Sequence, residues 1–171
     1  MTKIGIAALF TSLVLACGAI AAEAPQVGQA APDFALSSQD GNRISLKDFH
    51  GKWVVLYFYP KDMTQGCTIE AHNFQVDMPK YEKSNAVVVG VSVDSTDSHT
   101  EFCAKEGLSF KLLADTDKKV VDQYGSLNQR GMASRNTFLI DPAGKVAKVW
   151  TGVNPAKHSE EVLGALGEMK K

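Results

Sequence analysis

The sequence predicts an α/β fold with a mixed central sheet flanked by helices. Two apolar runs, residues 53–59 and 86–93, are suited to strands that are buried on both faces. A segment with helical signals follows each of them. Asp-Gly and Asp-Pro-Ala-Gly sequences between shorter strand-like runs indicate hairpins, whose strands must be antiparallel. Strands that alternate with helices, combined with hairpins, therefore predict a mixed sheet.

The predicted elements follow one another from the N-terminus. Residues 23–33 are expected as an extended lead-in, and a hairpin with Asp40-Gly41 at its turn follows. The later elements are expected as a strand over 53–59, a helix over 67–84 that Pro79 kinks or ends, a strand over 86–93, a helix through Glu106 that Gly107 closes, a strand over 110–113, a short helix over 118–124, a hairpin over 137–150 and a terminal helix over 155–170. This order fits a thioredoxin-like core with an extra N-terminal β-hairpin.

Length and charge limit the classes of function. The chain has 171 residues, and about 150 of them suffice for one domain that buries its own core. We expect that domain over residues 23–171. The formal net charge is −1 and no run is rich in Lys or Arg, which argues against nucleic acid as a partner.

The N-terminus predicts an export signal over residues 1–22. Lys3 supplies a positive charge, residues 4–20 are mostly apolar, and small residues around Ala21 and Ala22 suit cleavage. Removal of this segment would leave the domain in an exported compartment such as a bacterial periplasm. A membrane-spanning helix is the alternative, but the apolar stretch is slightly short and contains polar residues.

Cys17 adds another alternative at the same end. Residues 14–17 loosely resemble a bacterial lipoprotein cleavage box, so Cys17 is a candidate for lipidation and membrane anchoring. The leucine before Ala16 fits that box poorly. Export without a lipid anchor is therefore the favoured prediction.

Cys67 is the candidate nucleophile. It follows the strand over 53–59 and a loop punctuated by Pro60 and Gly66, where a helix is expected to begin. Backbone N–H groups and the positive end of the helix dipole stabilise an anion at such a position. A thiolate there is the reactive form of cysteine. The sequence therefore predicts thiolate chemistry.

Two motifs carry a resemblance to a known family. Pro60-x-x-x-Thr64-x-x-Cys67 and the later run over 135–141, Arg-Asn-Thr-Phe-Leu-Ile-Asp, resemble the peroxiredoxins. The run over 57–62, Tyr-Phe-Tyr-Pro-Lys-Asp, is most similar to the PrxQ, or bacterioferritin-comigratory-protein, branch. The resemblance extends from about residue 27 to the C-terminus.

The resemblance implies a thiol peroxidase that needs no metal or organic cofactor. It makes Cys67 the peroxidatic cysteine and Thr64, Arg135 and Pro60 its helpers. The residue types suit the chemistry, because a thiolate that attacks a peroxide moves negative charge onto the leaving oxygen. The Thr64 hydroxyl and the Cys67 N–H could donate to that oxygen, Arg135 adds a permanent charge, and Pro60 would shield the sulfur.

Each of these residues also has an ordinary structural interpretation. Cys67 could be an inert buried thiol, and Thr64 a turn or capping hydroxyl. Arg135 taken alone would be a surface charge. A first-turn Glu70 could hydrogen-bond within the site, or it could simply complement the helix dipole.

The partner of Cys67 is a further prediction. Many PrxQ proteins have a resolving cysteine five residues after the peroxidatic one, but here that position is His72. The resemblance then implies Cys103, on the next helix, as the resolver, although Cys103 could also be a core filler. Two helices are not expected to hold the two Cα atoms within disulfide range, so the Cys67 turn and part of the Cys103 helix should unwind.

The implied cycle leaves several alternatives open. A thioredoxin-like dithiol would reduce the Cys67–Cys103 disulfide, and PrxQ-like proteins are often monomers. A one-cysteine peroxidase with an external thiol as resolver is the nearest rival. A disulfide oxidoreductase would favour Cys-x-x-Cys, which is absent here. A metal site on Cys67, His72 and Cys103 matches no zinc spacing.

Overall fold

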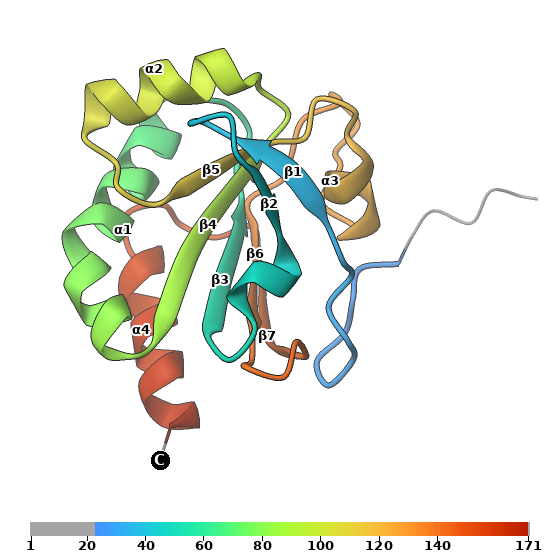
Figure 1. Cartoon of the computed structure of the whole chain (residues 1–171), viewed down its shortest axis with the longest axis vertical. Helices are drawn as coiled ribbons and strands as arrows, with labels where there is room; N and C mark the ends of the chain where they lie inside the picture. The colour runs from blue at the N-terminus through green and yellow to red at the C-terminus, as the bar shows by residue number, and fades with distance from the viewer. Residues whose placement is uncertain (1–22, 171) are drawn as a thin grey trace, which may run out of the picture.

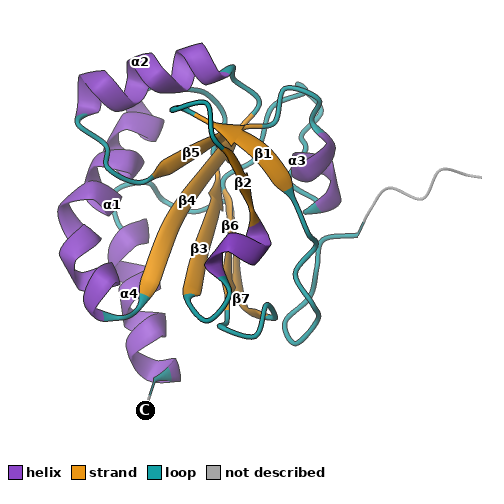
Figure 2. Ribbon diagram, in the orientation of Figure 1, coloured by secondary structure: helices purple, strands orange, loops and turns teal. Residues whose placement is uncertain are grey.

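A seven-stranded mixed sheet forms the centre of the molecule, as the computed structural model, which describes residues 23–170, shows (Figure 2). In sheet order the strands are β2 (Arg43–Ser45), β1 (Ala35–Ser38), β5 (Lys111–Ala114), β4 (Ala86–Ser92), β3 (Trp53–Phe58), β6 (Asn136–Ile140) and β7 (Val146–Thr151). The helices are the 3₁₀ turn η1 (Leu46–Phe49), α1 (Gln65–Lys83), α2 (Thr96–Glu106), α3 (Lys119–Gln123) and α4 (His158–Met169).

Strand direction determines which chain segments meet. β3 pairs with β4 in parallel and with β6 antiparallel. The carboxyl ends of β3 and β4 therefore lie at the same edge of the sheet as the start of β6. The loops that leave β3 and β4 and the segment that enters β6 are thus brought together at that edge.

The alternation of β3 divides the core into two layers. Val55 and Tyr57 belong to a buried cluster with residues of α1, α2 and α4, whereas Leu56 and Phe58 belong to the cluster on the opposite face, which α3 and η1 join. In Figure 1, α1 and α4 lie on one side of the sheet and α3 on the other. The expected strand buried on both faces is confirmed.

The predicted elements form, with differences in α4 and α1. The terminal helix α4 begins at His158, three residues after the expected start, and α1 differs in two places. The helix begins at Gln65, two residues before the expected start, and Thr64 is its N-cap residue. Pro79 does not end the helix, which continues to Lys83. The last turn persists because Tyr81 is fully buried and its hydroxyl donates to the Ser159 carbonyl of α4 at 2.9 Å. Tertiary packing thus outweighs the N–H that proline lacks.

The N-terminal hairpin is confirmed, with Leu36 opposite Ile44 in an antiparallel pair. Gly41 in its turn has a φ of +78°, which glycine adopts without steric strain. The export signal and the Cys17 lipidation site lie outside the described residues. Across the part of the chain that is described, none of the helices combines the length and the apolar character that a membrane span requires.

Candidate active site

Cys67 lies in the first turn of α1, at the sheet edge where β3 ends. The residue is 1 % exposed and packs in the cluster that contains Tyr57 and Phe74. The first backbone bond of the helix runs from the Thr68 N–H to the Thr64 carbonyl, at 2.9 Å. The Cys67 N–H therefore has no intrahelical acceptor and can donate to an anion or a substrate oxygen.

Arg135 brings its positive charge directly to the sulfur. Arg135 immediately precedes β6, and the antiparallel pairing of β6 with β3 places it beside the loop that leaves β3. Its Nη2 donates to Cys67 Sγ at 3.3 Å, and its Nη1 donates to Glu70 Oε2 at 2.6 Å. One guanidinium thus joins the thiol to a carboxylate, a geometry for which the fork of arginine is suited.

Glu70 is the other buried side chain of the site. It follows Cys67 by three residues, so both face the same side of α1. Glu70 is 1 % exposed, and burial raises its pKa from 4.5 to about 7, although the charge and hydrogen bond of Arg135 act in the opposite direction. The sequence left the role of Glu70 open between the helix dipole and the site, and the contact with Arg135 assigns it to the site.

Gly66 leaves the room that Arg135 occupies. A Cβ added to Gly66 would lie 2.7 Å from Arg135 Nη2. A side chain at this position would push the guanidinium away from Cys67. The glycine before the cysteine is therefore required by a close approach and not by an unusual φ.

Thr64 and Pro60 flank the cysteine less directly. The exposed Thr64 does not cap the helix with its side chain, and its hydroxyl donates to the Lys61 carbonyl at 2.9 Å. Donation to a peroxide would require this hydroxyl to turn away from Lys61. Pro60 is half-buried and lines a surface hollow of about 470 Å³ with residues 128–130 and 132. Its expected shielding of the sulfur stays a prediction.

Cys103 shares the core cluster of Cys67 but is not bonded to it. Both residues are free thiols, and Cys103 lies on α2. Burial, with a smaller contribution from the charge of Asp62, raises the pKa of Cys103 to about 11. Cys103 is therefore a protonated thiol at neutral pH in this conformation. His72, at the position of the usual PrxQ resolver, is exposed.

The sequence is also similar to known proteins across this whole region. The profile of the AhpC/TSA family matches residues 27–149. A protein of Helicobacter pylori named putative peroxiredoxin bcp is 45 % identical over 148 residues, which cover 82 % of this chain and 97 % of that protein. Peroxiredoxin Bcp of Bacillus subtilis is 39 % identical over 153 residues, which cover 85 % and 98 %. The chain belongs to the peroxiredoxins, in their Bcp, or PrxQ, branch.

Solved structures agree with this assignment of the fold. A cysteine-to-serine mutant of Xylella fastidiosa PrxQ superposes with a TM-score of 0.83 at 33 % identity, covering 87 % of this chain and 99 % of that one. A Xanthomonas campestris bacterioferritin comigratory protein, whose structures address alkyl peroxide reduction, gives 0.77 at 36 % identity, with 81 % and 92 % covered. This peroxiredoxin is a thiol-dependent peroxidase with the thioredoxin-like fold.

Sequence reasoning missed a buried polar cluster in this peroxiredoxin. The Asp62 carboxylate accepts hydrogen bonds from Tyr59 and Ser98, and it contacts His99 Nδ1 at 2.7 Å. The available signal was the spacing of His99 and Cys103, which lie four residues apart and so on one face of α2. Nothing in the sequence showed that Asp62 would reach that face.

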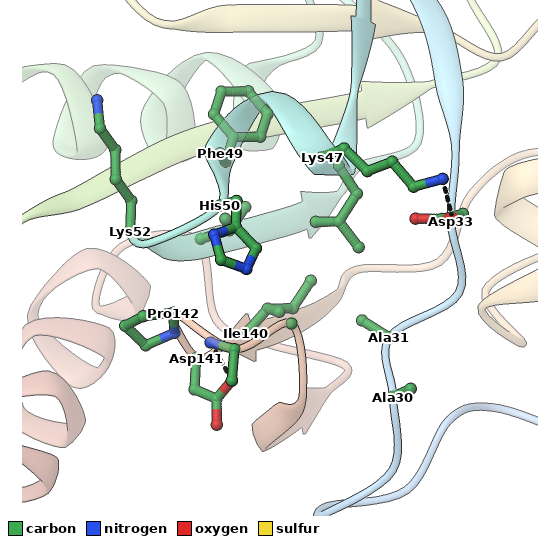
Figure 3. A pocket seen from close by; sticks show the side chains of 14 residues that line it. Ala30, Ala31, Asp33, Lys47, Phe49, His50, Lys52, Ile140, Asp141 and Pro142 are labelled. Carbon is green, nitrogen blue, oxygen red and sulfur yellow. Dashed lines mark hydrogen bonds and ion pairs between the residues drawn. The ribbon is translucent and has the colours of Figure 1, made fainter.

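A different pocket lies far from the thiol chemistry. A pocket of about 350 Å³ is bordered by His50, Val54 and Ile140 (Figure 3). Val54 and Ile140 are paired at the end of the sheet opposite to Cys67. This pocket therefore contributes no group to the peroxidase site.

The residues weighed as metal ligands do not form one site. Within residues 23–170, no three His, Cys, Asp or Glu side chains gather closely enough to hold a metal ion. Cys67 and Cys103 share the core cluster, whereas His72 is exposed on α1.

Proposed function

We propose that Cys67 is the peroxidatic cysteine of this peroxiredoxin and that Cys103 resolves it as an intramolecular disulfide. The contact of Arg135 Nη2 with Cys67 Sγ at 3.3 Å carries the proposal, because it places a permanently charged hydrogen-bond donor on the sulfur that is to react. The same guanidinium can donate to the oxygen that leaves during the reaction.

In the first step the Cys67 thiolate attacks the nearer oxygen of hydrogen peroxide or of an organic hydroperoxide. The O–O bond breaks, Cys67 becomes a sulfenic acid, and the other oxygen departs as hydroxide or alkoxide, which takes up a proton. Arg135 and the Cys67 N–H stabilise the charge on that oxygen. The Thr64 hydroxyl adds a donor when it turns from the Lys61 carbonyl to the peroxide.

In the second step Cys103 attacks the sulfenic sulfur. A Cys67–Cys103 disulfide forms, and water leaves with the sulfenic oxygen. A thioredoxin-like dithiol then reduces the disulfide by exchange and is itself oxidised. The high pKa of Cys103 in the closed structure supports a need for α2 to open, because the thiolate is the attacking form.

Single-turnover chemistry tests these roles. Reduced wild type treated with one equivalent of hydrogen peroxide should yield a Cys67–Cys103 link in non-reduced peptides. Cys67→Ser should consume no peroxide. Cys103→Ser should still consume one equivalent but stop at the sulfenic acid. Full turnover by Cys103→Ser with a thioredoxin donor would instead identify a one-cysteine peroxidase.

Export of the mature domain is a second part of the proposal. Lys3, the apolar residues 4–20 and the small residues up to Ala22 support a cleaved signal. The intact mass of the protein purified from a fractionated bacterial host should correspond to a start at residue 22 or 23, in the exported fraction. A diacylglycerol mass on Cys17 would identify the lipoprotein alternative.

The exported domain is proposed to work as a monomer with a thioredoxin-like donor of its own compartment, since cytosolic thioredoxin would be out of reach. Light scattering of the reduced domain should give a mass that matches one chain. A stable dimer would contradict this part without affecting the roles of the two cysteines.

A further inference from the structure

A buried hydrogen-bonded cluster joins the loop before Cys67 to the helix that carries Cys103. Four side chains, those of Tyr59, Asp62, Ser98 and His99, form what is called here the latch. The Tyr59 hydroxyl donates to Asp62 Oδ1 at 2.7 Å, and the Ser98 hydroxyl donates to Asp62 Oδ2 at 2.7 Å. His99 Nδ1 lies 2.7 Å from the same Oδ2. Asp62 is 5 % exposed and His99 is fully buried.

The chemistry of the carboxylate assigns the donors. Burial would raise the pKa of Asp62, but hydrogen bonds and charge from His99, with hydrogen bonds from Tyr59 and Ser98, hold it below its ordinary value. The carboxylate is therefore ionised and can only accept, so His99 Nδ1 must carry a proton. A buried carboxylate that accepts three such bonds is a strong connection between segments.

The two connected segments are those that the proposed disulfide would join. Asp62 lies in the loop five residues before Cys67, and its N–H also donates to Asp94 Oδ2 at 2.9 Å. His99 lies on α2, one turn before Cys103. β3 and β4 are parallel neighbours, so the loop after β3 and the helix after β4 meet at one sheet edge.

Several features of the same layer oppose the closed state. Met63, next to Asp62, has a φ of +59°, a left-handed conformation that is strained for a side chain of this kind. Within the described residues, Tyr57 Oη, Glu70 Oε1 and His99 Nε2 are buried without a hydrogen-bond partner. Opening would relax the strain and return these polar groups to water.

We propose that Asp62 and His99 are positioning residues whose latch holds the Cys67 loop on the Cys103 helix and sets the rate at which the disulfide closes. The inference rests on the proposed function. After peroxide has oxidised Cys67, the latch must open before Cys103 can reach the sulfenic sulfur. The S–S bond then forms and water departs, so no further reactant is needed.

Two substitutions weaken the latch without touching either cysteine. His99→Leu removes the donor to Asp62, and Asp62→Asn removes the charge while it keeps the shape. His99→Asn is the conservative variant, because its amide N–H can stand near the place of Nδ1. His158→Leu is the matched control, since His158 is equally buried but lies on α4 and bonds to Thr137 instead.

Hydrogen exchange of the reduced proteins is the first measurement. Peptides over 65–75 and 99–108 should exchange roughly ten-fold faster in His99→Leu and Asp62→Asn. The reason is that loss of a hydrogen bond to a charged group makes local opening more favourable by about that factor. Peptides over β3 and β4 should keep the wild-type rates. His99→Asn should return toward wild type, and His158→Leu should not accelerate these two peptides selectively.

The rate of disulfide closure is the second measurement. One equivalent of hydrogen peroxide is added to the reduced protein, and acid-quenched samples are analysed for the sulfenic acid and the Cys67–Cys103 bond. Closure should be several-fold faster in His99→Leu and Asp62→Asn than in wild type, because the open state is more populated. Closure in His158→Leu should match wild type.

The outcomes separate this inference from the function on which it rests. If both latch variants exchange and close at wild-type rates, the latch is refuted and the two-cysteine function stands. If His99→Leu does not fold, Asp62→Asn and Ser98→Ala decide the same question. A wild type that never forms the Cys67–Cys103 bond would refute the function, while the exchange comparison, which needs no peroxide, would still confirm or refute the latch as a restraint.

Discussion

Arg135 and Glu70 form an ion pair with 2.6 Å between Nη1 and Oε2. The Glu70 side chain is 1 % exposed, and Nη2 of the same guanidinium donates to Cys67 Sγ. Negative charge on Glu70 would repel negative charge that develops at the sulfur, and the guanidinium that contacts both groups offsets this repulsion. The pair therefore supports the site mainly by fixing where the guanidinium lies. The protonation state of Glu70 and the position of Arg135 should both affect peroxide reduction.

Replacement of Arg135 should slow the reaction of Cys67 with peroxide. Arg135→Gln keeps a polar side chain but removes the positive charge and one of the two hydrogen bonds, those to Cys67 and Glu70. Loss of one donor to the developing oxyanion is expected to lower the rate about 10²–10³-fold. Stopped-flow peroxide consumption by the reduced protein measures this. Arg43→Gln, at an exposed position of β2, is the control and should react at the wild-type rate.

Gly66→Ala should separate activity from stability. The new Cβ would lie 2.7 Å from Arg135 Nη2, so the guanidinium must move from the sulfur, and the rate should fall at least about ten-fold. Replacement of a helical glycine by alanine otherwise stabilises a helix by up to about 1 kcal/mol. Gly164→Ala is the control, because its Cβ would meet nothing within 4 Å. Equal rates in both variants would show that the approach of Arg135 is not required.

The elements of the fold could largely be predicted from the sequence because their signals are local. Residues 53–59 show their burial by a run of apolar side chains, and Gly107 closes α2 in the left-handed conformation that a glycine C-cap predicts, with a φ of +65°. The continuation of α1 past Pro79 could not be predicted. It depends on the burial of Tyr81 and its bond to Ser159, a contact 78 residues away in sequence.

In the site, too, features with local signals could be predicted and those that depend on distant contacts could not. The thiolate position of Cys67 follows from a strand, a loop and a helix start that are adjacent in sequence. The ion pair joins Arg135 to Glu70, which are separated by 65 positions in the sequence. The contact between Asp62 and His99 spans 37 positions. Such pairs depend on which strands are neighbours, and the strand order of a sheet is not encoded in any local pattern.

Glu70→Gln should change how stability depends on pH. The folded pKa of Glu70, raised by burial to about 7, lies above the ordinary value of 4.5. Between these values the folded protein holds a proton that the unfolded chain has released, so this contribution to the free energy of unfolding is complete below pH 4.5 and is lost as pH rises through 7. The free energy of unfolding of wild type relative to Glu70→Gln should fall by roughly 3 kcal/mol across that range. Urea unfolding at several pH values measures it, and Glu82→Gln, at an exposed position of the same helix, is the control.

His158 should give the opposite dependence. Burial lowers its pKa from 6.5 to about 4, so acid protonates the unfolded chain first and the stability present above pH 6.5 is lost as pH falls to 4. His158→Gln keeps an N–H near Thr137 but cannot titrate. The free energy of unfolding of wild type relative to this variant should decrease by roughly 3 kcal/mol from pH 6.5 to 4. A flat difference would mean that His158 is protonated in the folded protein, and His72→Gln, at an exposed position, serves as the control.

Tyr57→Phe should stabilise the reduced protein. Tyr57 is 1 % exposed, and among the described residues its hydroxyl has no hydrogen-bond partner. The site is tightly packed, since a Cβ on Gly90 would lie 2.8 Å from the Tyr57 hydroxyl oxygen. Removal of an unsatisfied buried hydroxyl should raise the free energy of unfolding by about 1 kcal/mol.

Tyr81→Phe is the matched control for this change. Tyr81 is as deeply buried, but its hydroxyl donates to the Ser159 carbonyl, so its loss should destabilise the protein by about 1 kcal/mol. Urea unfolding of both variants at pH 7, with the thiols kept reduced, gives the comparison. Opposite signs are expected from the same chemical change, because one hydroxyl is bonded and the other is not. A loss of stability in both variants would mean that the Tyr57 hydroxyl forms a hydrogen bond in solution. An unpaired Tyr57 hydroxyl could then no longer be counted among the features that favour opening around Cys67.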